Sequence, residues 1–173
     1  FIQTNVVGMA HLLNACLEEG TLERVIHTST SEVYGTAQYI PIDEKHPLQA
    51  QSPYAASKIA ADKLAESYYL SFGLPIAIIR PFNTFGPRQS LRAIIPTIIS
   101  QAIRDKKIRL GNIKPRRDFL FVKDTVKGFI QLGKCEGAVG KVINIGTGAD
   151  LSIEELVKKI LGLMGKQGKI EVE

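Results

Sequence analysis

The chain has 173 residues, 45% of them hydrophobic and 23% charged, and its 22 basic and 17 acidic side chains give a formal net charge of +5. This length suits a single globular domain. The sequence has neither the uncharged apolar run of about 18 residues that a transmembrane helix needs nor the basic and apolar start of a signal peptide. We therefore expect a cytoplasmic protein with no membrane partner.

Residues 2–19 carry apolar side chains at intervals of three and four and are followed by Gly20. This pattern predicts a helix with a glycine C-cap. Residues 24–28 are short, rich in β-branched side chains and end in a polar cluster. Such a segment is typical of a buried parallel strand.

Ser52 is the predicted N-cap of a long helix over residues 53–73, with Pro53 in its first turn and Gly73 at its end. Residues 76–79 form another fully apolar strand. The remaining pattern predicts a helix near 91–105, strands near 107–110 and 117–122, a helix near 124–134, a strand at 141–145 and a helix at 152–164.

Helices that alternate with near-continuous apolar strands predict the α/β class, with a parallel sheet covered on both faces. Ligands of such sheets bind beyond the carboxyl ends of the strands. Polar clusters follow two of the predicted strands, at residues 28–32 and 80–84. We therefore expect a functional site at that edge of the sheet.

Two cysteines, Cys16 and Cys135, are too few for a disulfide framework or a thiolate zinc cluster. Each stands in an apolar helical context, so we expect both thiols to be reduced and buried. The three histidines have no partners at metal-ligand spacing, and we expect no metal site.

A basic stretch lies in the second half of the chain, with Asp105 and Asp118 as its only acids. It could be a solvated face, a site for an anionic small molecule such as a nucleotide diphosphate, or a nucleic-acid site. Aromatic residues do not alternate with these cations, so we expect no nucleic-acid partner. The basic side chains are Arg104, Lys106, Lys107, Arg109, Lys114, Arg116 and Arg117.

Tyr54 and Lys58 stand four residues apart in the first turns of the long helix and project from one face. An ammonium near a phenol favours the phenolate, so we expect a lowered pKa for Tyr54 and a role as general base. The same spacing occurs on ordinary amphipathic helices, and the pair alone does not identify a site.

Other motifs accompany this pair over nearly the whole chain: TNVVG at 4–8, STSEVYG at 29–35, SPYAASK at 52–58, RPFNTFGPR at 80–88, RDFLFVKD at 117–124 and NIGTG at 144–148. In these motifs the sequence resembles the extended short-chain dehydrogenase/reductase family, which contains NAD-dependent nucleotide-sugar epimerases and dehydratases. Within it the chain is similar to the nucleotide-sugar 4,6-dehydratases, and overall it looks most like the branch that acts on UDP-N-acetylglucosamine.

The resemblance implies a Rossmann-like, doubly wound parallel sheet and part of a smaller substrate-binding subdomain. Residues 1–80 would form the C-terminal half of the NAD-binding subdomain, and residues 81–173 mostly the nucleotide-sugar subdomain. The family's glycine-rich βαβ unit would precede Phe1. The spacing Gly162–Gly168 imitates its glycine pattern but follows a predicted helix, so we interpret it as a helix end and a loop.

The resemblance also assigns roles to residues. The implied catalytic residues are Thr30, Ser31, Glu32, Tyr54 and Lys58; the implied NAD-binding residues are Thr4, Tyr54, Lys58 and Thr84; and the implied substrate-binding residues are Thr30, Asn83, Arg117 and Asn144.

The chemistry of elimination gives the catalytic residues separate tasks. Tyr54 would take the proton of the sugar 4-hydroxyl, with Lys58 lowering its pKa and Thr30 orienting the oxygen. Oxidation at C4 makes the C5 proton acidic, and Glu32 would remove it. Ser31 stands where an acid for the departing 6-hydroxyl is needed, and we expect it to share that task with Glu32.

Three alternatives remain open. A 4-epimerase needs Tyr54 but not Glu32, and Thr30-Ser31-Glu32 favours the dehydratases, since GDP-mannose 4,6-dehydratases carry this form. UDP-glucuronate decarboxylases share STSEVYG. A non-catalytic fragment that binds nucleotide sugars is the third alternative.

The resemblance further implies a homodimer formed through the helices at 2–19 and 53–73. The chain starts inside a predicted helix and stops inside a predicted strand, so we expect a fragment of a larger protein. Without the glycine-rich unit, we expect the isolated chain to bind NAD poorly and to turn over little.

Overall fold

The computed structural model describes residues 1–104 and 107–172. The chain divides into two compact units, each built from two segments: unit 1 from Phe1–Phe82 and Lys123–Ile145, and unit 2 from Asn83–Val122 and Gly146–Glu173. The first boundary falls near the expected division at residue 80. The return of residues 123–145 to unit 1 was not anticipated by that division.

Unit 1 contains most of the helical residues and the largest sheet. Its elements are η1 (Ile2–Val7), α1 (Gly8–Glu19), β1 (Val25–Thr28), η2 (Ser31–Tyr34), α2 (Pro53–Phe72), β2 (Ile76–Pro81), α4 (Val122–Lys134), η3 (Glu136–Ala138) and β7 (Val142–Ile145).

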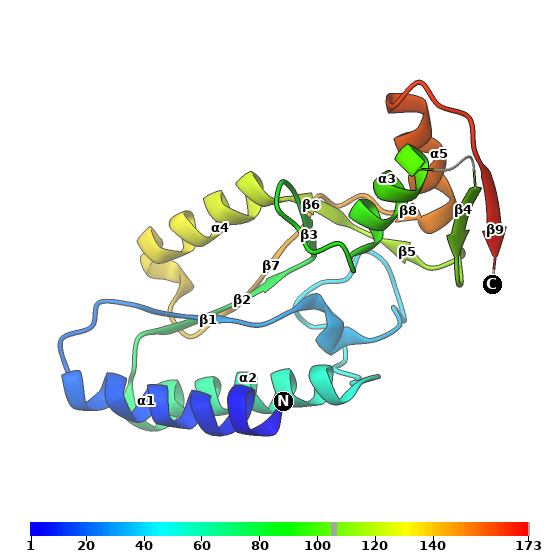
Figure 1. Cartoon of the computed structure of the whole chain (residues 1–173). Coiled ribbons are helices and arrows are strands. Elements are labelled where there is room, and N and C mark those ends of the chain that lie inside the picture. Colours follow the sequence, from blue (N-terminus) through cyan, green and yellow to red (C-terminus); the bar gives the residue numbers. More distant parts are fainter. Residues whose placement is uncertain (105–106, 173) are drawn as a thin grey trace. The chain divides into compact units, whose positions relative to one another are not determined.

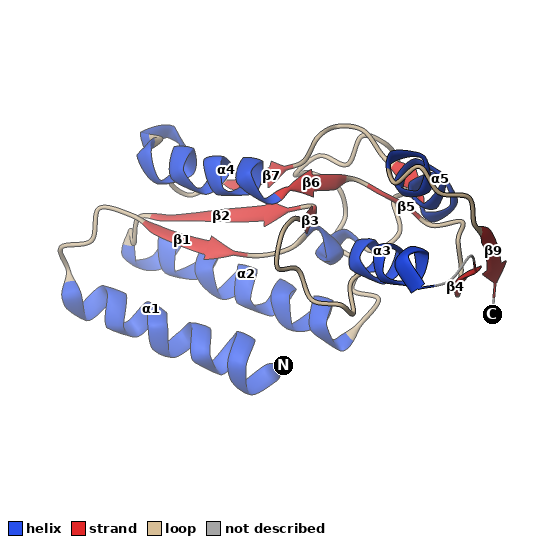
Figure 2. Cartoon of the chain, turned by 45° about the horizontal axis from the view of Figure 1, so that its top comes forward, coloured by secondary structure: helices blue, strands red, loops and turns tan. Residues whose placement is uncertain are grey.

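The sheet of unit 1 is parallel, with the strand order β1-β2-β7. Helices α1 and α2 lie on one face and α4 lies on the other (Figure 1), and the turned view in Figure 2 shows the same three layers. Alternate side chains of β2 lie on opposite faces of the sheet: Ile76 and Ile78 pack with α1 and α2, whereas Ala77 and Ile79 pack with α4. The prediction of a parallel sheet covered on both faces is confirmed.

Local sequence signals set the helix ends as predicted. The Ser52 hydroxyl accepts a hydrogen bond from the Ala55 amide at 3.0 Å and caps α2. Gly20 and Gly73 end α1 and α2 in the left-handed conformation, with φ of 67° and 70°. The predicted helix over 2–19 begins with a π-helical segment, η1, and becomes α-helical at Gly8.

The described residues of unit 2 form shorter strands and the helices α3 and α5. Its elements are β3 (Asn83–Phe85), α3 (Ile94–Arg104), β4 (Lys107–Leu110), β5 (Arg116–Arg117), β6 (Phe119–Phe121), β8 (Leu151–Ser152), α5 (Ile153–Leu163) and β9 (Lys169–Val172).

Three strand pairs organise unit 2: β3 with β6 and β4 with β9 are parallel, and β5 with β8 is antiparallel. Its core joins α3, β4 and α5 around Ile98, Ile108 and Val157, which are fully buried. The strand predicted over 117–122 is divided at Asp118: β5 on one side pairs with β8, and β6 on the other side pairs with β3.

The two thiols differ in exposure. Cys16 is buried in the core of unit 1, as expected, but Cys135 is exposed. The expectation for Cys135 was wrong: α4 ends at Lys134, as the predicted helix does, and the thiol lies in the turn before η3 and not on an apolar helix face. In the part of the chain that the structure describes, no helix is both long and apolar enough to cross a membrane.

Candidate active site

The turn that follows β1 carries three of the predicted catalytic residues. Thr30 has extended backbone and its hydroxyl accepts a hydrogen bond from the Glu32 amide at 3.2 Å, which starts the 3-10 turn η2. Gly35 ends the turn with φ of 65°, a conformation that favours glycine. This geometry holds Thr30, Ser31 and Glu32 at the carboxyl end of β1, the predicted location.

Helix α2 brings Tyr54 and Lys58 to the same place. The Lys58 ammonium donates a hydrogen bond to the Thr28 carbonyl, the last residue of β1. Tyr54 makes a side-chain hydrogen bond with Thr30 and lies close enough to Glu32 for that carboxylate to affect its pKa. The structure therefore brings the predicted catalytic residues together.

The pKa of Tyr54 differs from our expectation. Burial raises the pKa of this phenol, the negative charge of Glu32 raises it further, and the hydrogen bond with Thr30 lowers it only in part. The predicted lowering by Lys58 was wrong for the chain by itself, because helical spacing reveals neither the burial of the phenol nor the carboxylate that faces it.

Lys58 experiences two opposing effects. Burial lowers the pKa of its ammonium, and the negative charge of Asp62, one helical turn further on, raises it. Asp62 thus favours the charged form of Lys58, a relation that our sequence analysis missed. The signal was present, since Asp62 follows Lys58 at the same spacing that joins Tyr54 to Lys58.

Asn5 is a second residue that the sequence analysis missed. Its side-chain amide donates to the Ser57 hydroxyl at 2.9 Å, and that hydroxyl donates to the Tyr54 carbonyl at 2.7 Å. These bonds join η1 to the first turn of α2. Asn5 belongs to the TNVVG motif, but its neighbour Thr4, the residue that we selected, has an exposed side chain on η1.

Asn144, a predicted substrate contact, lies on β7 within a set of bonds inside unit 1. Its side-chain oxygen accepts from the Tyr34 hydroxyl at 2.8 Å, and its amide nitrogen donates to the Ile42 carbonyl at 3.3 Å. Its backbone amide donates to the Glu44 carboxylate at 2.8 Å. Asn144 thus holds the loop after η2 against the sheet, and its predicted contact with a nucleotide stays a prediction.

The other predicted substrate and cofactor residues belong to unit 2. Asn83 and Thr84 lie on β3, and the Asn83 amide donates to the Asp118 carbonyl at 3.1 Å. Arg117 lies on β5 with an exposed side chain that donates to the Arg116 carbonyl at 2.8 Å. Among the described residues no acidic side chain pairs with Arg117, so its guanidinium is available to an anion.

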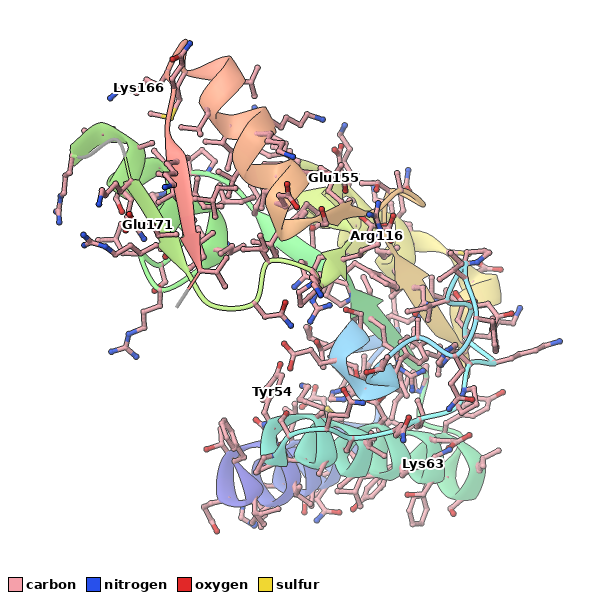
Figure 3. The ribbon with its side chains drawn as sticks, turned by 90° about the vertical axis from the view of Figure 1, so that its right-hand side faces the viewer. Tyr54, Lys63, Arg116, Glu155, Lys166 and Glu171 are labelled. Carbon is pink, nitrogen blue, oxygen red and sulfur yellow. The ribbon has the colours of Figure 1, made fainter. Side chains whose placement is uncertain are left out.

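Ion pairs occupy much of the basic stretch. Lys107 and Arg109 both pair with Glu171 on β9. Arg116 pairs with Asp150 and with Glu155, and Figure 3 shows Arg116 beside Glu155 at the start of α5. Of the stretch named from the sequence, Lys106 and Asp105 lie outside the described residues.

The carboxylate of Asp118 organises the loop that carries part of the NIGTG motif. It accepts hydrogen bonds from the Thr147 and Gly148 amides at 2.8 Å and 2.9 Å, and from the Thr147 hydroxyl at 2.7 Å. The RDFLFVKD and NIGTG motifs therefore meet within unit 2 through one acidic side chain.

Within residues 1–104 and 107–172 no group of three or more His, Cys, Asp or Glu side chains is arranged to hold a metal ion. The apparent glycine motif at 162–168 forms the end of α5 and the loop before β9. Gly165 in this segment has φ of 62°, as in a turn. The interpretation of this segment as a helix end and a loop is confirmed.

Comparison with known proteins identifies relatives of the whole chain. The sequence model of the family described as GDP-mannose 4,6 dehydratase matches residues 1–173. The chain is 36% identical over 165 residues to dTDP-D-glucose 4,6-dehydratase of Mus musculus, an alignment that covers 95% of this chain and 46% of that protein. The chain thus spans about half the length of the curated relatives that it matches.

Solved structures agree with this result. The structure of dTDP-glucose 4,6-dehydratase from Bacillus anthracis in complex with NAD matches with a TM-score of 0.92 and 35% identity, covering 100% of this chain and 56% of that chain. The structure of UDP-glucuronic acid 4-epimerase from Bacillus cereus in complex with UDP-glucuronic acid and NAD matches with a TM-score of 0.92 and 29% identity, covering 99% of this chain and 55% of that chain.

Proposed function

We propose that this chain carries the catalytic residues of a nucleotide-sugar 4,6-dehydratase. The chain belongs to the GDP-mannose 4,6 dehydratase family, which is one of the NAD-dependent epimerase and dehydratase families of the short-chain dehydrogenase/reductase type. The reaction is the NAD-dependent conversion of a nucleotide-diphosphate sugar into its 4-keto-6-deoxy product. The enzyme is a lyase, because one molecule of water leaves across C5 and C6. The relatives' names favour dTDP-glucose as the first donor to test.

One observation carries this proposal. A phenol, a hydroxyl and a carboxylate, from Tyr54, Thr30 and Glu32, lie within electrostatic or hydrogen-bonding reach at the end of β1. Oxidation alone requires only the phenol and its partners. Elimination also requires a base for a carbon-bound proton. Glu32 is exposed, and no hydrogen bond or ion pair with a described side chain occupies its carboxylate, so it is free to act as that base.

The protons move between named atoms of this chain. The Tyr54 phenolate oxygen takes the proton of the sugar 4-hydroxyl, while the Thr30 hydroxyl orients the oxygen of that 4-hydroxyl. The Glu32 carboxylate then removes the C5 proton, which the adjacent ketone has made acidic. Because a serine hydroxyl is a weak acid, we assign to Ser31 the transfer of a proton from Glu32 to the departing 6-hydroxyl.

The residues present fit one end of an NAD molecule. Lys58 has three donors, of which the structure uses one on the Thr28 carbonyl, so the ammonium retains donors for ribose hydroxyls. We propose Thr4, Tyr54, Lys58 and Thr84 as the residues of this chain that hold the cofactor. When bound, NAD accepts a hydride from the sugar and later returns it.

Arg117 and Asn83 are our proposed contacts to the sugar diphosphate, and Thr30 and Asn144 complete the substrate set. The exposed guanidinium of Arg117 has no acidic partner among the described side chains, and a planar guanidinium binds phosphate oxygens in a bidentate manner. Its neighbour Arg116 is held by Asp150 and Glu155, which makes it unsuitable for that task.

The test is incubation of the intact protein with NAD and one donor at a time: dTDP-glucose, UDP-N-acetylglucosamine, UDP-glucose, UDP-glucuronate or GDP-mannose. A product that has lost one water, measured by mass spectrometry, identifies both the dehydratase and its donor. Glu32→Gln should then abolish the loss of water while oxidation at C4 continues. Equal loss of both steps would contradict the role of Glu32.

A 4-epimerase is the second candidate, and two observations favour it. The acid position holds Ser31, a poor proton donor, and an epimerase is among the similar structures. In this case the product would have unchanged mass and an inverted 4-hydroxyl, and Glu32→Gln would leave the complete reaction nearly intact.

We further propose a homodimer in the cytoplasm. Exposed apolar side chains on the helices of unit 1 support a partner surface: Leu12 on α1 is 54% exposed, and Leu70 on α2 is 73% exposed. The two free thiols suit a reducing compartment. Light scattering of the intact protein tests the dimer, which Leu12→Glu combined with Leu70→Glu should dissociate.

A further inference from the structure

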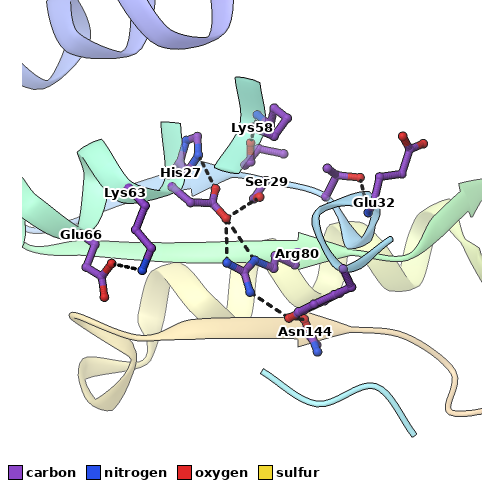
Figure 4. A network of polar contacts seen from close by, with 12 residues as sticks. His27, Ser29, Glu32, Lys58, Lys63, Glu66, Arg80 and Asn144 are labelled. Carbon is purple, nitrogen blue, oxygen red and sulfur yellow. Dashed lines mark hydrogen bonds and ion pairs between the residues drawn. The ribbon is translucent and has the colours of Figure 1, made fainter. Parts of the chain in front are cut away.

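Asp62, a buried carboxylate outside the proposed catalytic set, accepts hydrogen bonds on both of its oxygens. Asp62 on α2 is 2% exposed. Its Oδ1 accepts from His27 at 3.0 Å, and its Oδ2 accepts from the Ser29 hydroxyl at 2.9 Å and from two nitrogens of Arg80 at 3.1 Å and 2.8 Å. Figure 4 shows these bonds converging from β1 and β2 on the helix.

Arg80 extends the network toward the turn that carries Glu32. Arg80 is 3% exposed, and the third nitrogen of its guanidinium donates to the Tyr34 hydroxyl at 2.9 Å. It also lies 5.0 Å from the centre of the Tyr34 ring, in cation–π contact. Tyr34 is the last residue of η2, and its hydroxyl donates to Asn144 on β7.

The network connects the two halves of the proposed site. Lys58 and Asp62 stand on one face of α2 and meet three successive residues where β1 ends: the Thr28 carbonyl bonds to Lys58, and His27 on β1 and Ser29 just after it bond to Asp62. Through Arg80 the same carboxylate reaches the η2 turn. The positions of α2 and η2 thus both depend on contacts with the buried carboxylate of Asp62.

A contribution to stability is by itself a poor explanation for the buried ion pair between Asp62 and Arg80. Desolvation of two buried charges offsets most of their attraction, and well-packed apolar residues often replace a buried ion pair without loss. Hydrogen bonds have fixed directions, so they hold neighbouring elements in one register. Apolar packing fixes that register less strictly.

We propose that Asp62 is a positioning residue that, with Arg80, holds Lys58 and Tyr54 in register with the Thr30–Glu32 turn and keeps a negative charge one turn from the Lys58 ammonium. This inference rests on the proposed function. It adds to that function a residue that touches neither substrate nor cofactor.

The elements that contact α2 carry several charged or titratable groups. Burial lowers the pKa of its ammonium and the Asp62 charge raises it, so the geometry and the electrostatics agree. Segment η1 contributes no titratable side chain. The groups on the elements packed around this position are Tyr54 and Asp62 on α2, His27 on β1, Glu32 and Tyr34 on η2, and Arg80 on β2.

The experiment uses Asp62→Asn in the intact protein, with Glu66→Gln as the matched control. Glu66 is an exposed carboxylate one turn further along α2 whose pair with Lys63 is solvent-exposed. We expect Asp62→Asn to lower kcat about 10-fold or more with KM changed less than about 2-fold. The alkaline limb of the kcat profile should move to lower pH by roughly 0.5 unit or more, because Lys58 loses its proton more easily. Glu66→Gln should match the wild type.

A purely structural role gives a different result. Asp62→Asn would then only unfold at a lower temperature. Its pH profile of kcat, measured at a temperature at which the variant is folded, would overlay that of the wild type, and this result would overturn the inference. If Asp62→Asn does not fold, Tyr34→Phe replaces it, since it removes the hydroxyl that accepts from Arg80 and donates to Asn144 and leaves the ring in place. We expect a kcat lowered about 3-fold or more at unchanged KM, and wild-type kcat would overturn the inference.

A measurement that needs no turnover separates this inference from the proposed function. Competitive acetylation of lysines at a series of pH values, read by mass spectrometry, gives the apparent pKa of Lys58, with exposed Lys63 as internal reference. We expect a lower value for Lys58 in Asp62→Asn and an unchanged value for Lys63. An unchanged Lys58 contradicts the inference, whereas an inactive wild type with a shifted Lys58 contradicts only the proposed function.

Discussion

At the scale of single residues, the site depends on which charges face one another after folding. Glu32 faces Tyr54 and raises the pKa of its phenol, in addition to the effect of burial. The same carboxylate, which we propose as the base for elimination, therefore hinders formation of the phenolate that we propose for oxidation.

The pKa of Tyr54 gives the first prediction. Glu32→Gln removes a negative charge, so the pKa of Tyr54 falls and the phenolate forms at lower pH. We expect the acid limb of the C4 oxidation step, followed by the absorbance of reduced cofactor in a single turnover, to move to lower pH. Glu66→Gln should leave this limb in place. A limb that moves to higher pH would contradict the assigned contact.

Asp62 gives a prediction on stability. Its hydrogen bonds to His27, Ser29 and Arg80 hold its pKa below the ordinary value despite burial. Because the folded state binds this proton less readily than the unfolded state, the stabilisation is complete above about pH 5 and is lost as pH falls through about 3.9 and the lower folded value. Asp62→Asn should cost about 3–5 kcal/mol at pH 7. Urea denaturation should find this difference shrinking toward pH 3, and a constant difference would contradict the prediction.

Arg117 gives a prediction on binding. Loss of a guanidinium that pairs with a diphosphate weakens binding in both ground and transition states, so Arg117→Ala should raise KM for the nucleotide sugar about 10-fold or more with a smaller change in kcat. Lys114→Ala, which removes an exposed cation of the same stretch, is the control and should change KM less than about 2-fold. Equal effects of the two variants would indicate a general electrostatic field and not a specific contact.

At the scale of elements, the η2 turn depends on one glycine. A Cβ on Gly35 would lie 2.4 Å from the Gln49 carbonyl, and the residue has φ of 65°. Gly73 has the same handedness with φ of 70° but nothing within 4 Å. An alanine at position 35 would therefore meet both backbone strain and a close approach, whereas an alanine at position 73 would meet the strain alone.

This difference predicts unequal effects of two alanine substitutions. Gly73→Ala should cost about 1 kcal/mol, as measured by thermal unfolding, with normal kcat. Gly35→Ala should cost more and should also lower kcat about 10-fold or more, because the backbone that positions Thr30 and Glu32 must shift. Similar kcat in the two variants would show that the close approach to Gln49 has no catalytic importance.

Much of the element pattern follows from local signals and could be predicted. Ser52, Gly20 and Gly73 set helix ends through bonds or dihedral angles confined to neighbouring residues. The pKa direction at Tyr54 and the role of Asp62 could not be predicted, because each depends on groups that only the fold brings close. The exposure of Cys135 was missed because it depends on how the turn after α4 packs, which the sequence pattern does not show.

At the scale of the whole molecule, unit 1 presents a sheet with two free edges in the described residues. Strand β1 is one edge and β7 is the other. An edge strand carries unpaired backbone groups and invites further pairing. The chain also spans only 46% of its relative from Mus musculus and 56% of the similar solved chain from Bacillus anthracis.

We therefore predict that residues 1–173 by themselves bind NAD much more weakly than the intact protein. The residues that we assign to the cofactor contact only part of it, and the glycine-rich phosphate turn expected for this family is not among them. Isothermal titration of NAD into both proteins is the measurement, and we expect at least about a 100-fold difference in Kd. Equal affinities would mean that these residues alone make the essential contacts.

The interrupted course of unit 1 has a consequence for biosynthesis. Strand β7 pairs with β2 only after the first segment of unit 2, residues 83–122, has been made. A ribosome adds about 5–20 residues per second. An apolar strand thus leaves the exit tunnel several seconds before its second neighbour, and in that interval the nascent chain is a natural client for a chaperone.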